Sequence, residues 1–237
     1  MSGFSEKYGA FFTKEYMMGP NALRLLDEML GRYPLETKGR VLDLGCGTGL
    51  SSMFLAKETG AQVFAVDLWC SATDNYRRFC RWNVGENTVP VHADANELPF
   101  AEEFFDAVVS VDAYHYFACD GGYFQKKLLP LVKKGGWILI VVPGLREEFG
   151  NEIPAEMLEW AGEEYRLFHS CAWWKETIGE CAEIAQAEFF EMDCADEAWR
   201  EWFESGHEYA LRDREFFDRG VGKTMNFVGM AVRRSDS

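Results

Sequence analysis

The chain has 237 residues, enough for one large domain or two small ones, and 48% of them are hydrophobic, so it can bury a substantial core. Its formal net charge is −15. Nucleic acids and anionic membranes attract basic surfaces, so we expect neither as a partner. No apolar run reaches the roughly 18 residues of a membrane span. The seven cysteines fit reduced thiols and no signal-peptide pattern opens the chain, so we expect a cytoplasmic protein.

The most informative stretch covers residues 40–67 and begins RVLDLGCGTG. Its apolar residues 41–44 predict a strand buried on both faces. Residues 45–49 are too rich in glycine for a strand or a helix; glycine is needed where φ is positive or where a ligand lies against the backbone. We predict a helix over residues 51–59 and a second strand over residues 63–66. This order of elements is typical of units that bind adenosine.

Asp67 follows the second strand, 22 residues after Gly45, and adenosine-binding units place a ribose-binding carboxylate at a spacing of about 20. The helix after the turn offers free N–H groups and the positive end of its dipole. Dinucleotide-binding units carry a third glycine where this chain has Leu50. Leu50 therefore disfavours an NAD(P)-dependent oxidoreductase, which stays open as an alternative.

The order D-x-G-x-G-x-G, which begins at Asp43, resembles motif I of the class I S-adenosylmethionine-dependent methyltransferases. Three later motifs strengthen the resemblance. Residues 93–100 follow a third predicted strand and resemble the family's D-a-x-x-L-P-F signature. Residues 104–110 resemble its fourth strand, F-D-x-V-x-S, and residues 133–136 resemble the L-K-x-G-G turn before its fifth strand. The resemblance covers residues 40–143, with four motifs in the family's order.

The resemblance implies an S-adenosylmethionine site whose residues can be named. The residue at the Asp43 position helps to hold the ammonium of the methionine tail, which the glycine turn covers. Asp67 is expected on the ribose, Asp94 on the adenine amino group, and the backbone N–H of Ala95 on a ring nitrogen. In full, we expect the cofactor to be bound by Tyr16, Asp43, Gly45, Cys46, Gly47, Thr48, Asp67, Leu68, Asp94, Ala95 and Val111.

The resemblance also implies the fold. We expect one α/β domain with a seven-stranded, mostly parallel, doubly wound sheet, helices on both faces and an antiparallel last strand. A helical lid, the cofactor-binding core, a helical cap insertion and a part that completes the sheet should follow in order over residues 1–38, 39–143, 144–187 and 188–237. In the second half we predict strands over residues 189–194 and 224–233 and helices over residues 154–164, 173–187 and 197–211.

The expected activity is transfer of a methyl group to a small-molecule acceptor by in-line displacement. The acidic net charge favours a small acceptor, and so does the aromatic content of the expected cap: Trp160, Tyr165, Phe168, Trp173 and Trp174. These aromatics either line an acceptor pocket or anchor the core. A regulatory module that binds S-adenosylmethionine without methyl transfer stays open as an alternative. The histidines and cysteines show no metal-ligand spacing, so we expect no metal.

Three residues after the fourth strand are candidates for catalysis: His115, Tyr114 and Asp112. Histidine titrates near neutral pH, so His115 is a candidate to take a proton from a hydroxyl or thiol acceptor. Asp112 would orient it if the loop turns helically. Structural roles for His115 stay open: a helix cap, a bond to a backbone carbonyl, or packing on the cofactor. Tyr8 and Tyr16 are rival polar groups if the N-terminal segment closes over the cavity.

Overall fold

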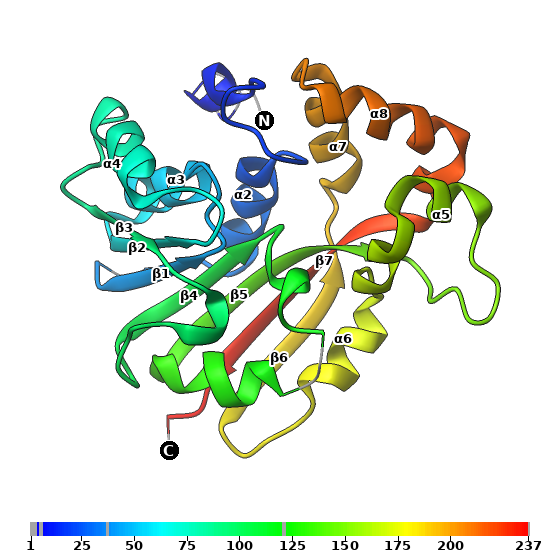
Figure 1. The fold of residues 1–237 in the computed structure, drawn as a ribbon. Coiled ribbons are helices and arrows are strands. Elements are labelled where there is room, and N and C mark those ends of the chain that lie inside the picture. The colour runs from blue at the N-terminus through cyan, green and yellow to red at the C-terminus, as the bar shows by residue number, and fades with distance from the viewer. Residues whose placement is uncertain (1–3, 5–6, 37, 120–121, 237) are drawn as a thin grey trace.

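A computed structural model of the chain describes residues 4, 7–36, 38–119 and 122–236. Residues 1–3, 5–6 and 37 of the expected lid, and Ser237, lie outside the described residues. The described part forms a layered α/β fold, with a twisted sheet through its middle and helices on both faces (Figure 1).

One seven-stranded sheet has the order β3-β2-β1-β4-β5-β7-β6. Neighbours among β1 to β5 pair in parallel, whereas β7 runs antiparallel to both β5 and β6. The predicted fold class is thereby confirmed. The strands are β1 (Arg40–Leu44), β2 (Gln62–Asp67), β3 (Thr88–His92), β4 (Phe105–Val111), β5 (Val132–Leu145), β6 (Ile184–Glu191) and β7 (Met225–Arg234).

The central strands are apolar on both sides because both faces of the sheet are covered. Val41 of β1 belongs to a hydrophobic cluster with α2, α3 and α7. The next residue, Leu42, points to the other face and joins a cluster with residues 124–131 and α6. The α-helices are α2 (Ala22–Arg32), α3 (Leu50–Thr59), α4 (Ala72–Arg81), α5 (Ala155–Ala161), α6 (Cys171–Ile178), α7 (Ala195–Glu204), α8 (Glu208–Phe216) and α9 (Gly222–Thr224).

Two predicted helices are wrong in their extent. The helix expected over residues 173–187 ends at Ile178, because Gly179 takes a positive φ of 66° and stops it. Strand β6 then begins at Ile184, earlier than the predicted 189. Most residues of this edge strand are partly or fully exposed, so the sequence lacks the alternation that marks a strand.

The helix expected over residues 197–211 is two helices. Helix α7 ends at Glu204, and α8 begins at Glu208 with His207 as its N-cap. Gly206, between them, has a φ of 76°, which breaks the helical path. The break turns α8 away from α7, toward α5, as the right side of Figure 1 shows.

The strand order reverses between β1 and β4, which are neighbours although two strands separate them in sequence. Chain crossovers leave in opposite directions from such a point, so a crevice opens at the carboxyl ends of the strands. Loops after β1, β2 and β4 meet there, together with the N-terminal segment that crosses above α2 in Figure 1. The candidate functional site lies at this crevice.

Candidate functional site

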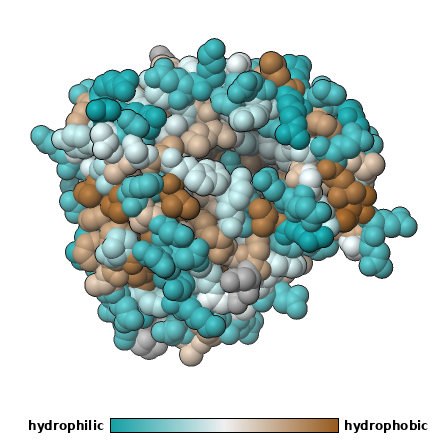
Figure 2. All heavy atoms as spheres, in the orientation of Figure 1, coloured by the Kyte–Doolittle hydropathy of each residue, from teal (hydrophilic) through white to brown (hydrophobic). Residues whose placement is uncertain are grey.

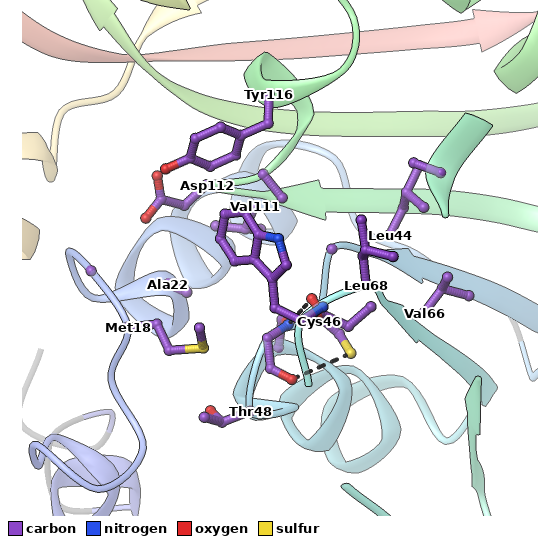
Figure 3. Close-up of a pocket in the computed structure, with 18 of the residues that line it drawn as sticks. Met18, Ala22, Leu44, Cys46, Thr48, Val66, Leu68, Val111, Asp112 and Tyr116 are labelled. Carbon is purple, nitrogen blue, oxygen red and sulfur yellow. Dashed lines mark hydrogen bonds between the residues drawn. The ribbon is translucent and has the colours of Figure 1, made fainter. Parts of the chain in front are cut away.

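A cavity of about 420 Å³ opens at the carboxyl ends of β1, β2 and β4, within the roughly 300–1,000 Å³ of small-molecule sites. A hollow in the upper middle of Figure 2 marks this region, and Figure 3 shows the lining side chains. Residues 16–20 and Ala22 of the N-terminal segment close one side. The predicted cofactor residues that line it are Tyr16, Gly45, Cys46, Gly47, Thr48, Asp67, Leu68, Asp94, Ala95 and Val111.

The glycine turn packs tightly against its neighbours. Gly45 has a φ of 77°, and its N–H donates to the Val66 carbonyl over 2.8 Å. A Cβ on Gly45 would lie only 2.2 Å from the Cβ of Ala113 in the loop after β4. A Cβ on Gly49 would lie 2.4 Å from the Phe79 ring. Glycine is therefore required at both positions by packing, independently of any ligand.

Asp67 is held by three backbone donors. One carboxylate oxygen accepts from the N–H of Gly47 over 2.8 Å, and the other accepts from the N–H groups of Trp69 and Cys70 over 2.8 and 2.7 Å. The side chain fixes the turn after β1 to the loop after β2. An ionised carboxylate has about four acceptor positions, so it keeps one for a ligand hydroxyl.

Asp94 lies where the sequence predicts the adenine contact. It caps the short helix η2 (Ala95–Glu97), and its Oδ1 accepts from the backbone N–H and the side-chain amide of Asn96 over 2.8 and 3.0 Å. The Tyr123 hydroxyl donates to the Ala95 carbonyl over 2.7 Å. These bonds hold Asp94 and Ala95 in the cavity wall. The second carboxylate oxygen of Asp94 accepts no hydrogen bond from any described residue.

Asp43 does not line the cavity. It is fully buried behind the glycine turn, where the hydroxyls of Ser51 and Ser52 donate to Oδ2 over 2.7 and 2.5 Å. Burial raises the pKa of its carboxyl to about 6, and Oδ1 has no partner among the described residues. Ser51 lines the cavity and binds Asp43, whereas Asp43 itself does not line it. This placement disfavours the predicted direct contact between Asp43 and the cofactor ammonium, which stays a prediction.

Asp112 faces the cavity from the loop after β4. It is one of three described non-glycine residues with positive φ, at 57°, and its N–H donates to the Val141 carbonyl over 2.8 Å. Its carboxylate makes no hydrogen bond with any described residue, and a Cβ on Gly19 would lie 2.6 Å from Oδ2. Burial, reinforced by the negative charge of Asp213, raises the pKa of Asp112 to about 7.

The other two catalytic candidates point away from the cavity. The short helix η3 (Tyr114–Tyr116) sends His115 into the core, 1% exposed, with ring centroids 6.0 Å from Phe168. Its Nδ1 has no partner among the described residues, and burial lowers its pKa to about 3. Tyr114 is buried against Trp174. A direct catalytic role for either stays a prediction, and a histidine with so low a pKa is a poor base at neutral pH.

The expected rival tyrosines differ. Tyr16 lines the cavity, and its carbonyl accepts from the Thr48 hydroxyl over 2.6 Å. Tyr8 is buried and donates to Glu58, away from the cavity. The bond between Thr48 and Tyr16 thus attaches the N-terminal segment to the glycine turn.

Several lining residues were missed by the sequence reasoning, notably Met18 and Trp69, which are 52% and 67% exposed. An indole directly after the strand-end pair Asp67-Leu68 was the available clue. None of the five aromatics of the expected cap lines the cavity; Trp160 stacks on Phe168, and Trp173 stacks on His169. They act as packing groups in this structure.

Within residues 4, 7–36, 38–119 and 122–236, no group of three or more His, Cys, Asp or Glu side chains is placed to hold a metal ion. In those same ranges, no helix has the length and apolar character needed to cross a bilayer.

Residues 41–136 match a family model described as a methyltransferase domain. The 27-O-demethylrifamycin SV methyltransferase of Amycolatopsis mediterranei is 27% identical over 114 residues, which cover 48% of this chain and 42% of that protein. A tRNA (carboxymethyluridine(34)-5-O)-methyltransferase of Xenopus tropicalis is 32% identical over 111 residues, which cover 46% of this chain and 16% of that protein. The chain thus aligns with less than half the length of these relatives.

The whole described fold has counterparts among solved structures. Phosphoethanolamine N-methyltransferase 2 of Haemonchus contortus, solved with S-adenosyl-L-methionine, matches with a TM-score of 0.72 at 20% sequence identity. The match covers 99% of this chain and 56% of that one. At this identity the likeness concerns the fold alone.

Proposed function

We propose that the chain is a class I S-adenosylmethionine-dependent methyltransferase that transfers a methyl group to a small-molecule acceptor by in-line displacement. The match of residues 41–136 to a methyltransferase-domain model supports this proposal. The observation that carries this proposal is a single cavity that joins the glycine turn, Asp67 and Asp94. These are groups that the resemblance assigns to the cofactor, and they come from three separate loops.

The cavity residues fit this cofactor in shape and in chemistry. A Cβ on Gly47 would lie 2.9 Å from the Met18 sulfur, so glycine keeps the cavity open at this point. Asp67 keeps an acceptor position for ribose hydroxyls, and Asp94 keeps an oxygen for an amino group. When bound, the cofactor supplies a methyl group that is already activated by a positively charged sulfur. The task left to the protein is to hold the acceptor close and in line.

The aromatic side chains of the cavity suit that task. Tyr16, Trp69, Tyr116 and Phe117 all line it, and Trp69 packs edge-on against Tyr116 with ring centroids 5.3 Å apart. Aromatic walls exclude water, and their ring faces attract positive charge such as a sulfonium. The cavity volume, about 420 Å³, favours a small acceptor beside the cofactor.

A nucleic-acid acceptor is the main rival, because some relatives are named tRNA methyltransferases. The net charge of −15 opposes it, since RNA binding requires a basic surface that displaces counterions. The charged side chains among the described cavity residues are three aspartates, which would repel phosphates. Both observations support the small-molecule acceptor.

Methyl incorporation tests the proposal. The protein is incubated with S-adenosylmethionine carrying a tritiated methyl group and, in parallel, with a low-molecular-mass cell extract, total RNA and total protein. We expect label in the low-molecular-mass fraction. Label in RNA or protein instead would overturn the small-molecule acceptor. Absence of label in every fraction, from a protein that binds the cofactor, would favour the regulatory alternative.

A further inference from the structure

The cavity differs from a neutral cofactor pocket in its charge. Its charged lining residues, among those that the structure describes, are Asp67, Asp94 and Asp112, with no lysine, arginine or histidine beside them. Asp67 and Asp94 lie in the part assigned to the ribose and the adenine, and both accept backbone N–H groups. Asp112 lies on the other side, in the loop after β4, and carries the negative charge that the proposed function leaves unused.

Asp112 is presented to the cavity at a cost in conformational energy. Non-glycine residues seldom adopt a φ of 57°, and such positions cluster at ligand sites. Its carboxylate is partly exposed, lines the cavity and has no hydrogen-bond partner among the described residues. The left-handed conformation and the missing partner together indicate a side chain that is set to meet a ligand.

The surroundings of Asp112 favour a cationic ligand. Asp213 lies near enough to raise the pKa of Asp112 further, after burial, and none of the described basic groups opposes the shift. Asp213 is itself fixed by the indole N–H groups of Trp160 and Trp202, each over 2.8 Å. A positive charge beside Asp112 would relieve both unfavourable effects.

An aromatic ring completes this corner. The Tyr116 hydroxyl points toward the Asp112 carboxylate in Figure 3, and burial together with the charges of Asp112 and Glu164 raises the pKa of the Tyr116 phenol. Tyr116 thus stays a neutral phenol, able to donate a hydrogen bond, and its ring meets Trp69 at the cavity wall. A carboxylate with aromatic rings around it is the combination that binds alkylammonium groups.

We propose that the methyl acceptor is a primary or secondary amine, bound as its ammonium ion by Asp112 beside Tyr116. This inference rests on the proposed function. Before transfer the nitrogen gives one proton to the Asp112 carboxylate. Its lone pair then forms the new N–CH₃ bond while the bond from methyl to sulfur breaks, and that electron pair stays on sulfur. Asp112 finally releases its proton to solvent, so charge and atoms balance.

Binding probes of one skeleton test the charge preference. Wild-type protein is first titrated with S-adenosylhomocysteine, and the saturated complex is then titrated with phenethylamine, 2-phenylethanol and 3-phenylpropanoate, which are cationic, neutral and anionic. We expect phenethylamine to bind at least tenfold more tightly than the other two. Failure of phenethylamine to bind, or no preference for it, would overturn the amine. Failure of S-adenosylhomocysteine to bind would instead overturn the proposed function.

Two variants test whether Asp112 is the residue that causes the preference for a cationic probe. Asp112→Asn should abolish it while leaving the affinity for S-adenosylhomocysteine unchanged, which also shows that the variant folds. Asp196→Asn removes the same charge from an exposed position on α7 and should change neither affinity. If Asp112→Asn keeps the preference, the carboxylate does not bind the amine. If it weakens S-adenosylhomocysteine instead, Asp112 holds the cofactor's own ammonium, and the proposal is overturned.

The natural acceptor is tested without knowing its identity. The low-molecular-mass extract is treated with an acylating reagent selective for amines, quenched, and offered to the protein with tritiated S-adenosylmethionine. We expect methyl incorporation to fall at least tenfold relative to an extract given quenched reagent. Incorporation that survives acylation would overturn the amine acceptor while leaving the proposed methyl transfer intact.

Discussion

The loops after β2 and β4 both follow buried parallel strands and both aim an aspartate at one cavity, yet the two carboxylates are treated oppositely. Asp67 receives three backbone hydrogen bonds. Asp112 receives none from the described residues and has a raised pKa of about 7. The first loop is complete without a ligand, whereas the second carries an electrostatic cost that a ligand can remove.

This difference distinguishes binding of the cofactor from selection of the methyl acceptor. A carboxylate that is fixed by backbone N–H groups has the same position in any sequence that keeps the turn, which suits a cofactor common to a family. An unsatisfied carboxylate lowers stability, and proteins keep such groups where binding requires them. The loop after β4 is therefore where we locate selection of the acceptor.

The largest expected effect tests the contact between the glycine turn after β1 and the loop after β4. Gly45→Ala would place a Cβ 2.2 Å from Ala113 at a φ of 77°, so the free energy of unfolding should fall by about 3 kcal/mol. Gly60→Ala is the matched control, since Gly60 also has positive φ, 71°, but open space around it. It should cost about 1 kcal/mol. Equal losses in urea denaturation would show that the loops do not constrain each other.

Asp67→Ala comes next. It removes a charged acceptor from the ribose position and frees three backbone N–H groups, so affinity for S-adenosylhomocysteine should fall by about 1.5–3 kcal/mol. That loss corresponds to roughly ten- to a hundredfold in Kd. Titration calorimetry measures it. An unchanged Kd in a folded variant would remove Asp67 from the cofactor site and would erase the contrast with Asp112.

Asp112→Asn should stabilise the protein, and the gain should depend on pH. Because the carboxyl pKa is about 7 in the fold against an ordinary 3.8, ionisation costs stability above pH 3.8, and the cost is complete above pH 7. Asparagine adopts left-handed φ readily, so the loop is kept. We expect a melting temperature about 2–4 °C higher at pH 8, a gain on the order of 1 kcal/mol, and little change at pH 4. A lower melting temperature at pH 8 would show that the ionised carboxylate is satisfied.

The smallest effect concerns His115. Burial lowers its pKa to about 3 from an ordinary 6.5. Below pH 6.5 the imidazole is therefore protonated in the unfolded chain but stays neutral in the folded protein, so the free energy of unfolding falls as the pH drops. His115→Phe should remove that part of the decline, about 0.8 kcal/mol at pH 6. Urea denaturation at pH 7.5 and pH 6 compares the two proteins. Identical pH dependence would mean that His115 is protonated in the fold.

The cofactor half of the site was predictable because local sequence determines it. Glycines at positions with positive φ and aspartates at strand ends act within their own loops, so spacing predicted the placement of Gly45 and Asp67. The resemblance of residues 93–100 to a family signature predicted that of Asp94. Asp43 and His115 lie in the loops and strands where the sequence predicted them, but their side chains point away from the cavity. The direction of a side chain at a turn depends on packing from distant elements: α3 contributes Ser51 and Ser52, and the cap contributes Phe168.

The acceptor half depends on contacts that are distant in sequence. The sequence named Asp112 only as a residue that would orient His115. Its place at the cavity depends on distant contacts, since it lies next to Gly19 and its pKa depends on Asp213. The helix expected over residues 173–187 was too long for a similar reason, since residues 184–191 form a strand by pairing with β7. The resemblance implied the seven-stranded, mostly parallel sheet and the cofactor loops, while the strand order and the packing of α5 to α8 required the structure.

The most direct test of the account is a calorimetric titration of the unmodified protein with S-adenosylhomocysteine and, separately, with NAD. We predict that S-adenosylhomocysteine binds at one site per chain and that NAD does not bind, because Leu50 replaces the glycine of a dinucleotide turn. Binding of NAD without binding of S-adenosylhomocysteine would contradict both the cofactor and the reaction proposed for this cavity.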